Sequence, residues 1–206
     1  MHLEQRPTIK GRIHLDEKYI KVNKEDYYDL NAIDAKTKHV LAHLFVEKRT
    51  IRNCIRFLRQ IKKTCYDQIL EKYKLWKCKK GKCIIFVCDK FANYKNAFTK
   101  LFYHVAMLHF GVPIKAKKNG LQHNNNPIER YNQDIKDQIK TKRHFGSYEG
   151  AKEFLDLRHV IKNFVNPHQS LKGKTPAEAA EIKLSLGRDK LRNLIRYKAK
   201  SKMTKS

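Results

Sequence analysis

Three acidic residues spread along the chain could together carry out metal-dependent chemistry. Asp16 lies in the alternating stretch HLDEKYIKV, Asp89 directly follows the apolar run CIIFVC, and Glu129 lies in NNNPIERYNQDIKDQIK. Three carboxylates that converge cannot all stay ionised without cations. Oxygen ligands of this kind select Mg²⁺ or Mn²⁺, and two such ions can hold the attacking and leaving oxygens of a phosphoryl transfer. The pattern therefore suggests a site for one or two divalent ions.

Each acidic residue also has a simpler interpretation. The helix around Glu129 could be an amphipathic surface helix whose charged face is only solvated. Asp16 and Asp89 could be ordinary strand or turn residues. The metal site is favoured because the three residues occur together, in an order of elements that could join them, on a strongly basic chain.

The helix that carries Glu129 is predicted from its start and its periodicity. Asn126 suits the N-cap, Pro127 suits the first helical position, and Glu129 lies in the first turn, where negative charge is favoured. Apolar residues recur at helical spacing and should form a buried stripe: Ile128, Tyr131, Ile135 and Ile139. A neighbouring face carries the charged residues: Glu129, Lys136, Lys140 and Arg143.

The charge of the chain points to a polyanionic partner. The net charge is +26, from 46 Lys+Arg against 20 Asp+Glu, which is more than solubility requires. Nucleic acid is the first candidate, and an anionic membrane surface is the second, although no basic amphipathic helix stands alone for that role. No apolar run approaches membrane-spanning length, and the N-terminus MHLEQRPTIK lacks a signal-peptide core. We therefore expect a cytoplasmic, nucleoid-associated protein.

The cysteines do not indicate a metal site. There are five of them, an odd number, and none forms a CxxC pair. Cys78, Cys83 and Cys88 recur every five residues, which is not a usual zinc spacing. We interpret all of them as reduced thiols of a cytoplasmic protein.

The elements that must position the acidic residues follow from periodicity. Alternating or apolar stretches predict an antiparallel meander of three strands near residues 12–22, 27–34 and 40–46. A long helix follows Thr50, then a buried strand at 83–88, a helix around 94–105, a short strand at 112–114 and the Glu129 helix. A further helix begins at Ser147, and the run Thr175 to Glu178 is a capping box. With the first strand in mid-sheet beside the fourth, Asp16 and Asp89 would be neighbours.

Four segments of the chain resemble the catalytic domain of DDE transposases and integrases of bacterial and archaeal insertion sequences. They are HLDEKYIKV, FVCDKFANY, NNPIERYNQDIK and NPHQSLKGKTPAEA. The resemblance implies an α/β, ribonuclease-H-like fold: a mixed five-stranded sheet, with three antiparallel strands and then alternating helices and strands, flanked by helices. It also implies that Asp16, Asp89 and Glu129 are catalytic ligands of one or two Mg²⁺ or Mn²⁺ ions. The implied activity is DNA cleavage followed by strand transfer.

The same resemblance implies how DNA is bound. The family carries a lysine or arginine two helical turns after the glutamate, which here is Lys136. The basic residues expected to bind DNA are Lys136, Lys140, Arg130, Arg143, Lys115, Lys117 and Lys118. The expected partners are the element ends and target DNA, with the chain a homo-oligomer on DNA and with neither a membrane nor a small-molecule substrate.

The chain also departs from the family pattern. Relatives usually carry an N-terminal helix-turn-helix that recognises the element ends, and we expect this chain to lack that module. The expected parts of the chain are a flexible segment at 1–10, the catalytic domain at 11–185 and a basic C-terminal helix and tail at 186–206. The longer gap between Asp89 and Glu129 predicts a longer loop around residues 115–123. A truncated or repurposed transposase that only binds DNA without sequence preference is the main alternative, and a structure-selective nuclease is another.

Overall fold

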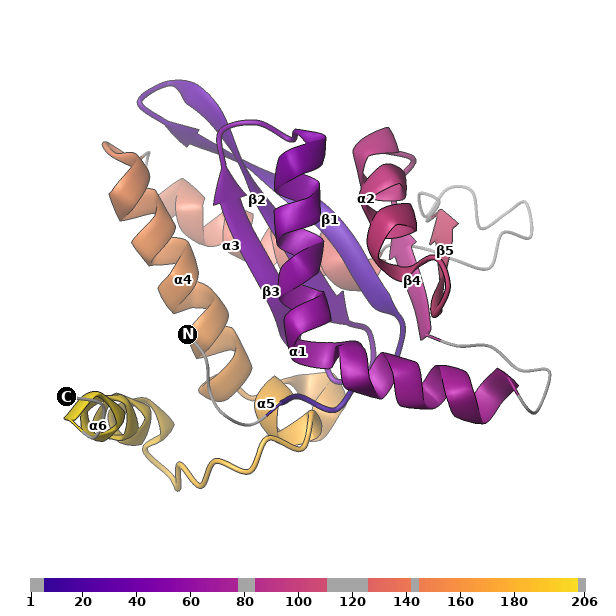
Figure 1. Ribbon diagram of the computed structural model, residues 1–206. Helices are drawn as coiled ribbons and strands as arrows, with labels where there is room; N and C mark the ends of the chain where they lie inside the picture. The colour runs from indigo at the N-terminus through magenta and orange to yellow at the C-terminus, as the bar shows by residue number, and fades with distance from the viewer. Residues whose placement is uncertain (1–5, 78–83, 111–125, 142–144, 204–206) are drawn as a thin grey trace.

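A five-stranded mixed sheet forms the centre of the protein (Figure 1). The structure is a computed structural model that describes residues 6–77, 84–110, 126–141 and 145–203. The strands are β1 (Ile13–Val22), β2 (Glu25–Asp34), β3 (Val40–Val46), β4 (Ile84–Cys88) and β5 (Ala106–Phe110). The helices are α1 (Ile51–Lys77), α2 (Ala92–Phe102), α3 (Asn126–Thr141), α4 (Tyr148–Phe164), the 3₁₀ helix η2 (Gln169–Leu171), α5 (Pro176–Ala179) and α6 (Lys190–Met203).

The strand order is β3-β2-β1-β4-β5, which confirms that the first strand lies in mid-sheet beside the fourth. β1 pairs with β2 in antiparallel register along its whole length, through a tight turn at Asn23 and Lys24 with φ of 48° and 70°. On its other side β1 runs parallel to β4, and β4 runs parallel to β5. The meander and the buried fourth strand therefore form one sheet.

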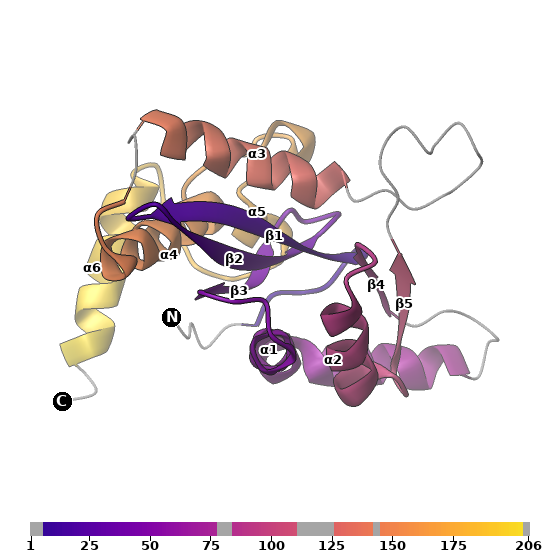
Figure 2. The ribbon, with the colours of Figure 1, turned by 90° about the horizontal axis from the view of Figure 1, so that it is seen from above.

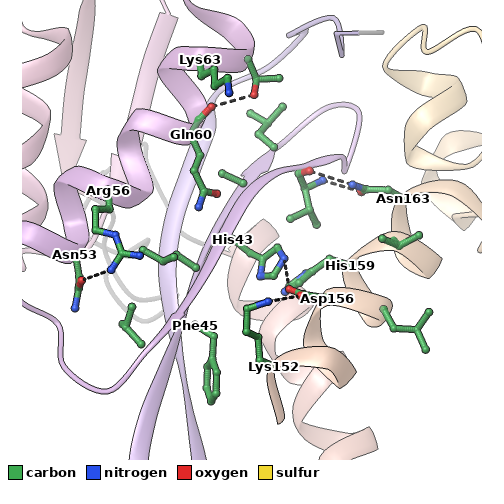
Figure 3. A pocket seen from close by; sticks show the side chains of 18 of the residues that line it. His43, Phe45, Asn53, Arg56, Gln60, Lys63, Lys152, Asp156, His159 and Asn163 are labelled. Carbon is green, nitrogen blue, oxygen red and sulfur yellow. Dashed lines mark hydrogen bonds and ion pairs between the residues drawn. The ribbon is translucent and has the colours of Figure 1, made fainter. Parts of the chain in front are cut away.

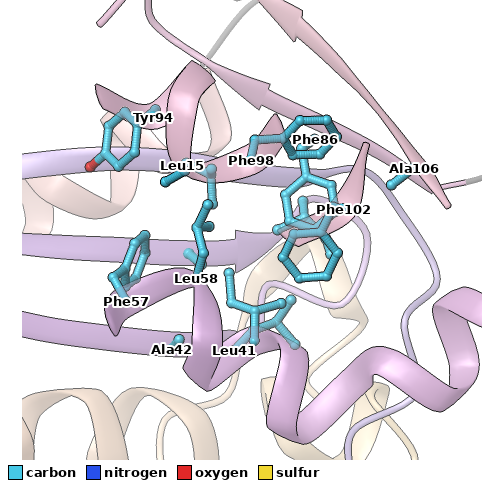
Figure 4. Packing of buried hydrophobic residues seen from close by; sticks show 14 of the residues in the cluster. Leu15, Leu41, Ala42, Phe57, Leu58, Phe86, Tyr94, Phe98, Phe102 and Ala106 are labelled. Carbon is cyan, nitrogen blue, oxygen red and sulfur yellow. The ribbon is translucent and has the colours of Figure 1, made fainter. Parts of the chain in front are cut away.

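The two faces of the sheet pack against different helices. Because side chains alternate along a strand, Ile13 and Leu15 point to one face of β1, whereas Ile20 and Val22 point to the other. Figure 2 shows α1 and α2 on the first face and α3 and α4 on the second. The first face is the larger core, where the aromatic rings of Phe57, Phe86 and other residues pack around Leu15 and Leu58 (Figure 4).

The fifth strand differs from the prediction. The predicted strand at 112–114 lies outside the described residues, and the strand that pairs with β4 is Ala106–Phe110. The helix before it ends at Phe102, three residues earlier than predicted, because the Val105 N–H bonds the Phe102 carbonyl at 2.9 Å and closes a turn. That turn directs the short apolar run AMLHF into the sheet.

Local signals at the helix ends agree with the structure. The Ser147 side chain accepts a hydrogen bond from the Gly150 N–H at 3.1 Å and caps α4. The capping box at α5 is confirmed, because Thr175 and Glu178 each accept the other's backbone N–H, at 3.2 and 2.8 Å. Within the described part of the chain, no helix combines the length and the apolar character needed to cross a membrane.

The N-terminal segment that was expected to be flexible is packed where the structure describes it. Ile9 is 1% exposed and lies in the larger core. The side chain of Gln68 on α1 accepts the Ile9 N–H at 3.0 Å and donates to the Pro7 carbonyl at 2.7 Å. The Thr8 N–H bonds the Ala180 carbonyl at 2.8 Å, beside α5. Residues 6–10 thus connect α1 with the C-terminal part of the chain.

This packing predicts that Ile9→Ala destabilises the protein by about 3 kcal/mol, the usual cost of emptying a buried isoleucine site. Urea unfolding followed by circular dichroism measures the difference. Arg12→Ala, at an exposed neighbouring position, is the control and should change stability by less than about 0.5 kcal/mol. Equal midpoints for the two variants would show that Ile9 is not part of the core.

Candidate active site

The register of the two central parallel strands determines where Asp16 and Asp89 stand. Ile13 pairs with Phe86 and His14 with Val87. The separation in sequence between Asp16 and Asp89 is the same as that between Ile13 and Phe86. The two aspartates therefore occupy matching positions, at the point where β4 ends and β1 continues. Carboxyl ends of parallel strands are where open α/β sheets bind their ligands.

The two aspartates have different surroundings. Asp16 is partly buried, and burial, followed by the neighbouring negative charge of Glu17, raises the pKa of Asp16 to about 7. The negative charge of Asp89 contributes to the same increase. Asp89 stands at the turn into α2, where its Oδ1 accepts the Phe91 N–H at 3.1 Å. This hydrogen bond holds the Asp89 carboxylate next to the sheet edge.

Helix α3 brings its polar face to Asp16. Its apolar stripe is confirmed, because Ile128, Tyr131 and Ile135 are all buried against the sheet and Ile139 packs beside them. The Nδ2 of Asn132 donates a hydrogen bond to Asp16 Oδ2 at 2.9 Å. Since residues three and four apart share a helix face, Glu129 stands on the Asp16 side, one turn before Asn132.

Glu129 does not complete a tight ligand cluster with the two aspartates. Its side chain is exposed, one helical turn from the contact between Asn132 and Asp16. Within the described ranges, the group of three potential metal ligands whose donor atoms all lie within 4.8 Å of one another consists of Asp29, His43 and His159. The Glu129 side chain therefore has to turn toward Asp16 and Asp89 if it shares an ion with them.

The predicted DNA-binding residues that the structure describes fall into two groups, and four others lie outside the described residues. Lys136 and Lys140 are exposed on α3, and both lie near Lys18 of β1, whose pKa is lowered by burial and then by these positive charges. Arg130 lies instead near Lys38, and burial and the charge of Arg130 both lower the pKa of Lys38. The remaining predicted residues lie outside the described residues: Lys115, Lys117, Lys118 and Arg143.

Sequence reasoning missed three polar residues of this region. Asn132 and Lys18 could have been found from spacing, because Asn132 is one turn after Glu129 and Lys18 shares the strand face of Asp16. Glu17 points to the other face and is only 5% exposed in its side chain. Its negative charge acts on both Asp16 and Asp89.

Glu17 is held by Arg49, which follows β3. The guanidinium of Arg49 forms an ion pair with Glu17 and lies over the rings of Tyr19, Tyr28 and Phe91, 4.6–5.4 Å from their centroids. Burial and the charge of Asp89 nevertheless keep the pKa of Glu17 raised. Arg49 beside Glu17 and Lys18 beside Asp16 thus stand against the three neighbouring carboxylates of Asp16, Glu17 and Asp89.

This excess of negative charge fits a cation site. Asp16, Glu17 and Asp89 act on one another electrostatically, and the increased pKa of Asp16 reflects that repulsion together with burial. All the donors that Asp16, Asp89 and Glu129 offer are carboxylate oxygens, the ligands that Mg²⁺ and Mn²⁺ prefer. The chemistry of these side chains therefore fits a divalent cation.

Comparison with known families identifies the class of the protein. The family described as the DDE domain matches residues 10–168, more than half of the chain. The chain therefore belongs to the family of DDE domains, and the predicted ribonuclease-H-like fold is confirmed. A comparison with curated proteins gives no match.

Solved structures agree on the fold. A chain of the simian T-cell lymphotropic virus intasome, in complex with a PP2A regulatory subunit, matches with a TM-score of 0.55 and 13% identity, over 89% of this chain and 61% of that chain. The HTLV-2 integrase catalytic core domain in complex with magnesium matches with a TM-score of 0.50 and 14% identity, over 85% of this chain and 99% of that chain. The present chain thus spans less than two thirds of the length of the intasome chain. At these identities, the likeness concerns the fold alone.

The Glu17–Arg49 pair leads to a stability prediction. Arg49→Gln should destabilise the protein by about 3 kcal/mol, because removing one partner leaves the other charge buried and unpaired. Adding Glu17→Gln to the same chain should restore most of that loss, since the unpaired charge is then absent. Urea unfolding of the two variants measures the effect.

Arg52→Gln, at an exposed arginine in the first turn of α1, is the matched control and should leave stability nearly unchanged. If the double variant were as unstable as Arg49→Gln, packing of the guanidinium on the aromatic rings would account for the loss, and the unpaired charge would not.

Proposed function

We propose that the chain is the catalytic core of a transposase that cleaves DNA strands and joins them to target DNA with Mg²⁺ or Mn²⁺. The observation that supports this most strongly is the matching position of Asp16 and Asp89 on the paired strands β1 and β4, in a chain that belongs to the DDE domains. The proposed ligands of one or two ions are Asp16, Asp89 and Glu129.

The residues of the chain have separate roles in this proposal. Asn132 orients the Asp16 carboxylate through its hydrogen bond, and the Phe91 N–H orients that of Asp89. Glu129, exposed at the rim, turns inward when ions and DNA are present. The ions, when bound, supply an activated water or 3′-hydroxyl nucleophile and offset charge on the phosphate.

Lysines beside the carboxylates are proposed to hold the DNA backbone. Lys18, Lys136 and Lys140 lie close together on β1 and α3. Phosphate contacts of this kind give affinity through counterion release without reading base sequence. With a net charge of +26, binding should be strong and salt-sensitive. DNA is therefore the proposed partner, and assembly as a homo-oligomer on DNA is part of the same proposal.

One observation favours the alternative, a protein that binds DNA without chemistry. The Glu129 side chain is exposed, and the carboxylates of Glu129, Asp16 and Asp89 do not all lie within 4.8 Å of one another. The two proposals share the DNA-binding surface and differ in whether the carboxylates act. Variants of the carboxylates therefore separate them.

Asp89→Asn should lower plasmid nicking in Mg²⁺ or Mn²⁺ by roughly a hundredfold or more, because a neutral amide is a poor ligand for a hard cation. Affinity for a short duplex should stay the same or rise slightly, since a negative charge is lost. Glu129→Gln should behave in the same way.

Asp137→Asn is the control for these variants, because Asp137 is an exposed carboxylate on α3, 58% exposed in its side chain. Nicking rates as high in Asp89→Asn as in Asp137→Asn would count against the catalytic proposal. Absence of metal-dependent nicking in every protein, with DNA binding intact, would favour the alternative.

Lys136→Ala tests whether this lysine positions DNA at the site. Orientation contributes to the barrier as well as to binding, so the single-turnover nicking rate at saturating DNA should fall well beyond the loss of affinity. Lys100→Ala, an exposed lysine at the far end of α2, is the same-charge control. Equal single-turnover rates in the two variants would exclude the positioning role. Lys136 would then contribute one phosphate contact at most, which changes the slope of log affinity against log salt concentration by about one unit or less.

A further inference from the structure

Three side chains of the types that ligate metals meet in the protein interior, and none is among the proposed catalytic ligands. Asp29 comes from β2, His43 from β3 and His159 from α4, and one donor atom of each lies within 4.8 Å of the others. The side chain of Asp29 is fully buried, that of His159 is 4% exposed, and that of His43 is 23% exposed. Figure 3 shows His43 and His159 beside each other, with Asp156 next to them.

The contacts within this group are incomplete. His159 Nε2 lies 3.1 Å from Asp29 Oδ2. His43 Nδ1 lies 3.6 Å from Asp29 Oδ1, which is too long for a hydrogen bond. His43 Nδ1 and Asp29 Oδ1 are both buried without a hydrogen-bond partner. A carboxylate oxygen and a ring nitrogen left unsatisfied in the interior are costly, and a metal ion bound between the oxygen and the neutral imidazole would satisfy both.

The other atoms of the same side chains are all engaged. His43 Nε2 lies 3.1 Å from a carboxylate oxygen of Asp156, and His159 Nδ1 is hydrogen-bonded to the Tyr131 hydroxyl. Asp29 Oδ2 accepts a hydrogen bond from Asn31 Nδ2 at 3.0 Å. Ligands of protein-bound metals are held in this way, with a carboxylate or hydroxyl on the ring nitrogen that does not bind the ion.

We propose that Asp29, His43 and His159 bind one divalent transition-metal ion of the zinc class. Two imidazole nitrogens and one carboxylate oxygen suit Zn²⁺ and its neighbours, whereas Mg²⁺ prefers oxygen ligands throughout. The site therefore differs in metal preference from the carboxylates at Asp16 and Asp89. It does not rest on the proposed function.

The ion has access to this site from the surface. His43, Asp156 and His159 line a groove of about 1190 Å³ that is bordered by α1, β3 and α4. The competing occupant is a proton on His43. Burial lowers the pKa of His43, but the carboxylates of Asp156 and Asp29 outweigh burial and raise it to about 9. Metal binding must displace that proton, so the experiment has to separate the two occupants.

A bound ion would connect β2, β3 and α4 at a point next to the proposed active site. Asn31, which donates to Asp29, lies 3.4 Å from the Asn132 side chain, and Asn132 in turn donates to Asp16. The two amides form a short bridge from the proposed metal site to a proposed catalytic carboxylate. The inferred role is structural: it holds the second face of the sheet in place beneath α3 and α4.

The test is metal content of the full chain, purified without a histidine tag, stripped with chelator and dialysed against Zn²⁺ or Co²⁺. The wild type and Asp89→Asn/Glu129→Gln should each retain one equivalent of Zn²⁺. His43→Gln and His159→Gln should lose it, whereas His104→Gln, at an exposed histidine, should keep it. The Co²⁺ form should show visible absorption without a thiolate-to-metal band, which excludes the cysteines as ligands.

Asp156→Asn keeps all three ligands and should weaken Zn²⁺ binding by about 10- to 100-fold, the usual effect of removing a partner of a metal-bound histidine. This variant keeps the proposal testable if a histidine variant folds poorly. The proposal is overturned if the wild type retains no Zn²⁺, in which case the proton is the occupant. It is also overturned if folded His43→Gln keeps Zn²⁺, or if the ion is lost in Asp89→Asn/Glu129→Gln but not in the histidine variants.

Discussion

The structure depends on β1 being hydrogen-bonded on both sides, antiparallel to β2 and parallel to β4. β2 pairs with β1 along its whole length, whereas β4 pairs with Ile13 and His14 at its start, and this short parallel pairing fixes the register of β1 against β4. Asp16 and Asp89 are far apart in the sequence, and only this register brings them to the same level. A shift of one residue would move Asp16 to the opposite face, away from α3.

Alternation along β1 produces two different carboxylate environments at adjacent residues. Asp16 faces α3 and is held by the amide of Asn132, whereas Glu17 faces α1 and α2 and is paired with Arg49. The charges still act on one another, because Glu17 contributes to the raised pKa of Asp16. The buried ion pair is therefore part of the electrostatics of the proposed site, although its side chains belong to the other face.

The face of the sheet beneath α3 and α4 is unusual for its buried polar groups. Asp29 and Asn31 of β2 are fully buried there and interact with His159 and Asn132 of the two helices. An apolar stripe on α3 would be enough to dock this helix, and it sets the rotation that places Asn132 against Asp16. The polar contacts add a directional requirement, since hydrogen bonds must be satisfied once their groups leave water.

The sequence by itself determined the elements that local rules govern: the meander, the buried fourth strand, the stripe on α3 and the capping box of Thr175 and Glu178. Periodicity and end signals act over a few residues, so they can be seen without the fold. The pairing of Glu17 with Arg49 and the meeting of Asp29, His43 and His159 could not be seen in that way. These contacts join residues on separate elements, and only sheet register and helix docking bring those residues together. The fifth strand was misplaced for a similar reason, because a short apolar run becomes a strand only when a neighbouring strand offers it backbone hydrogen bonds.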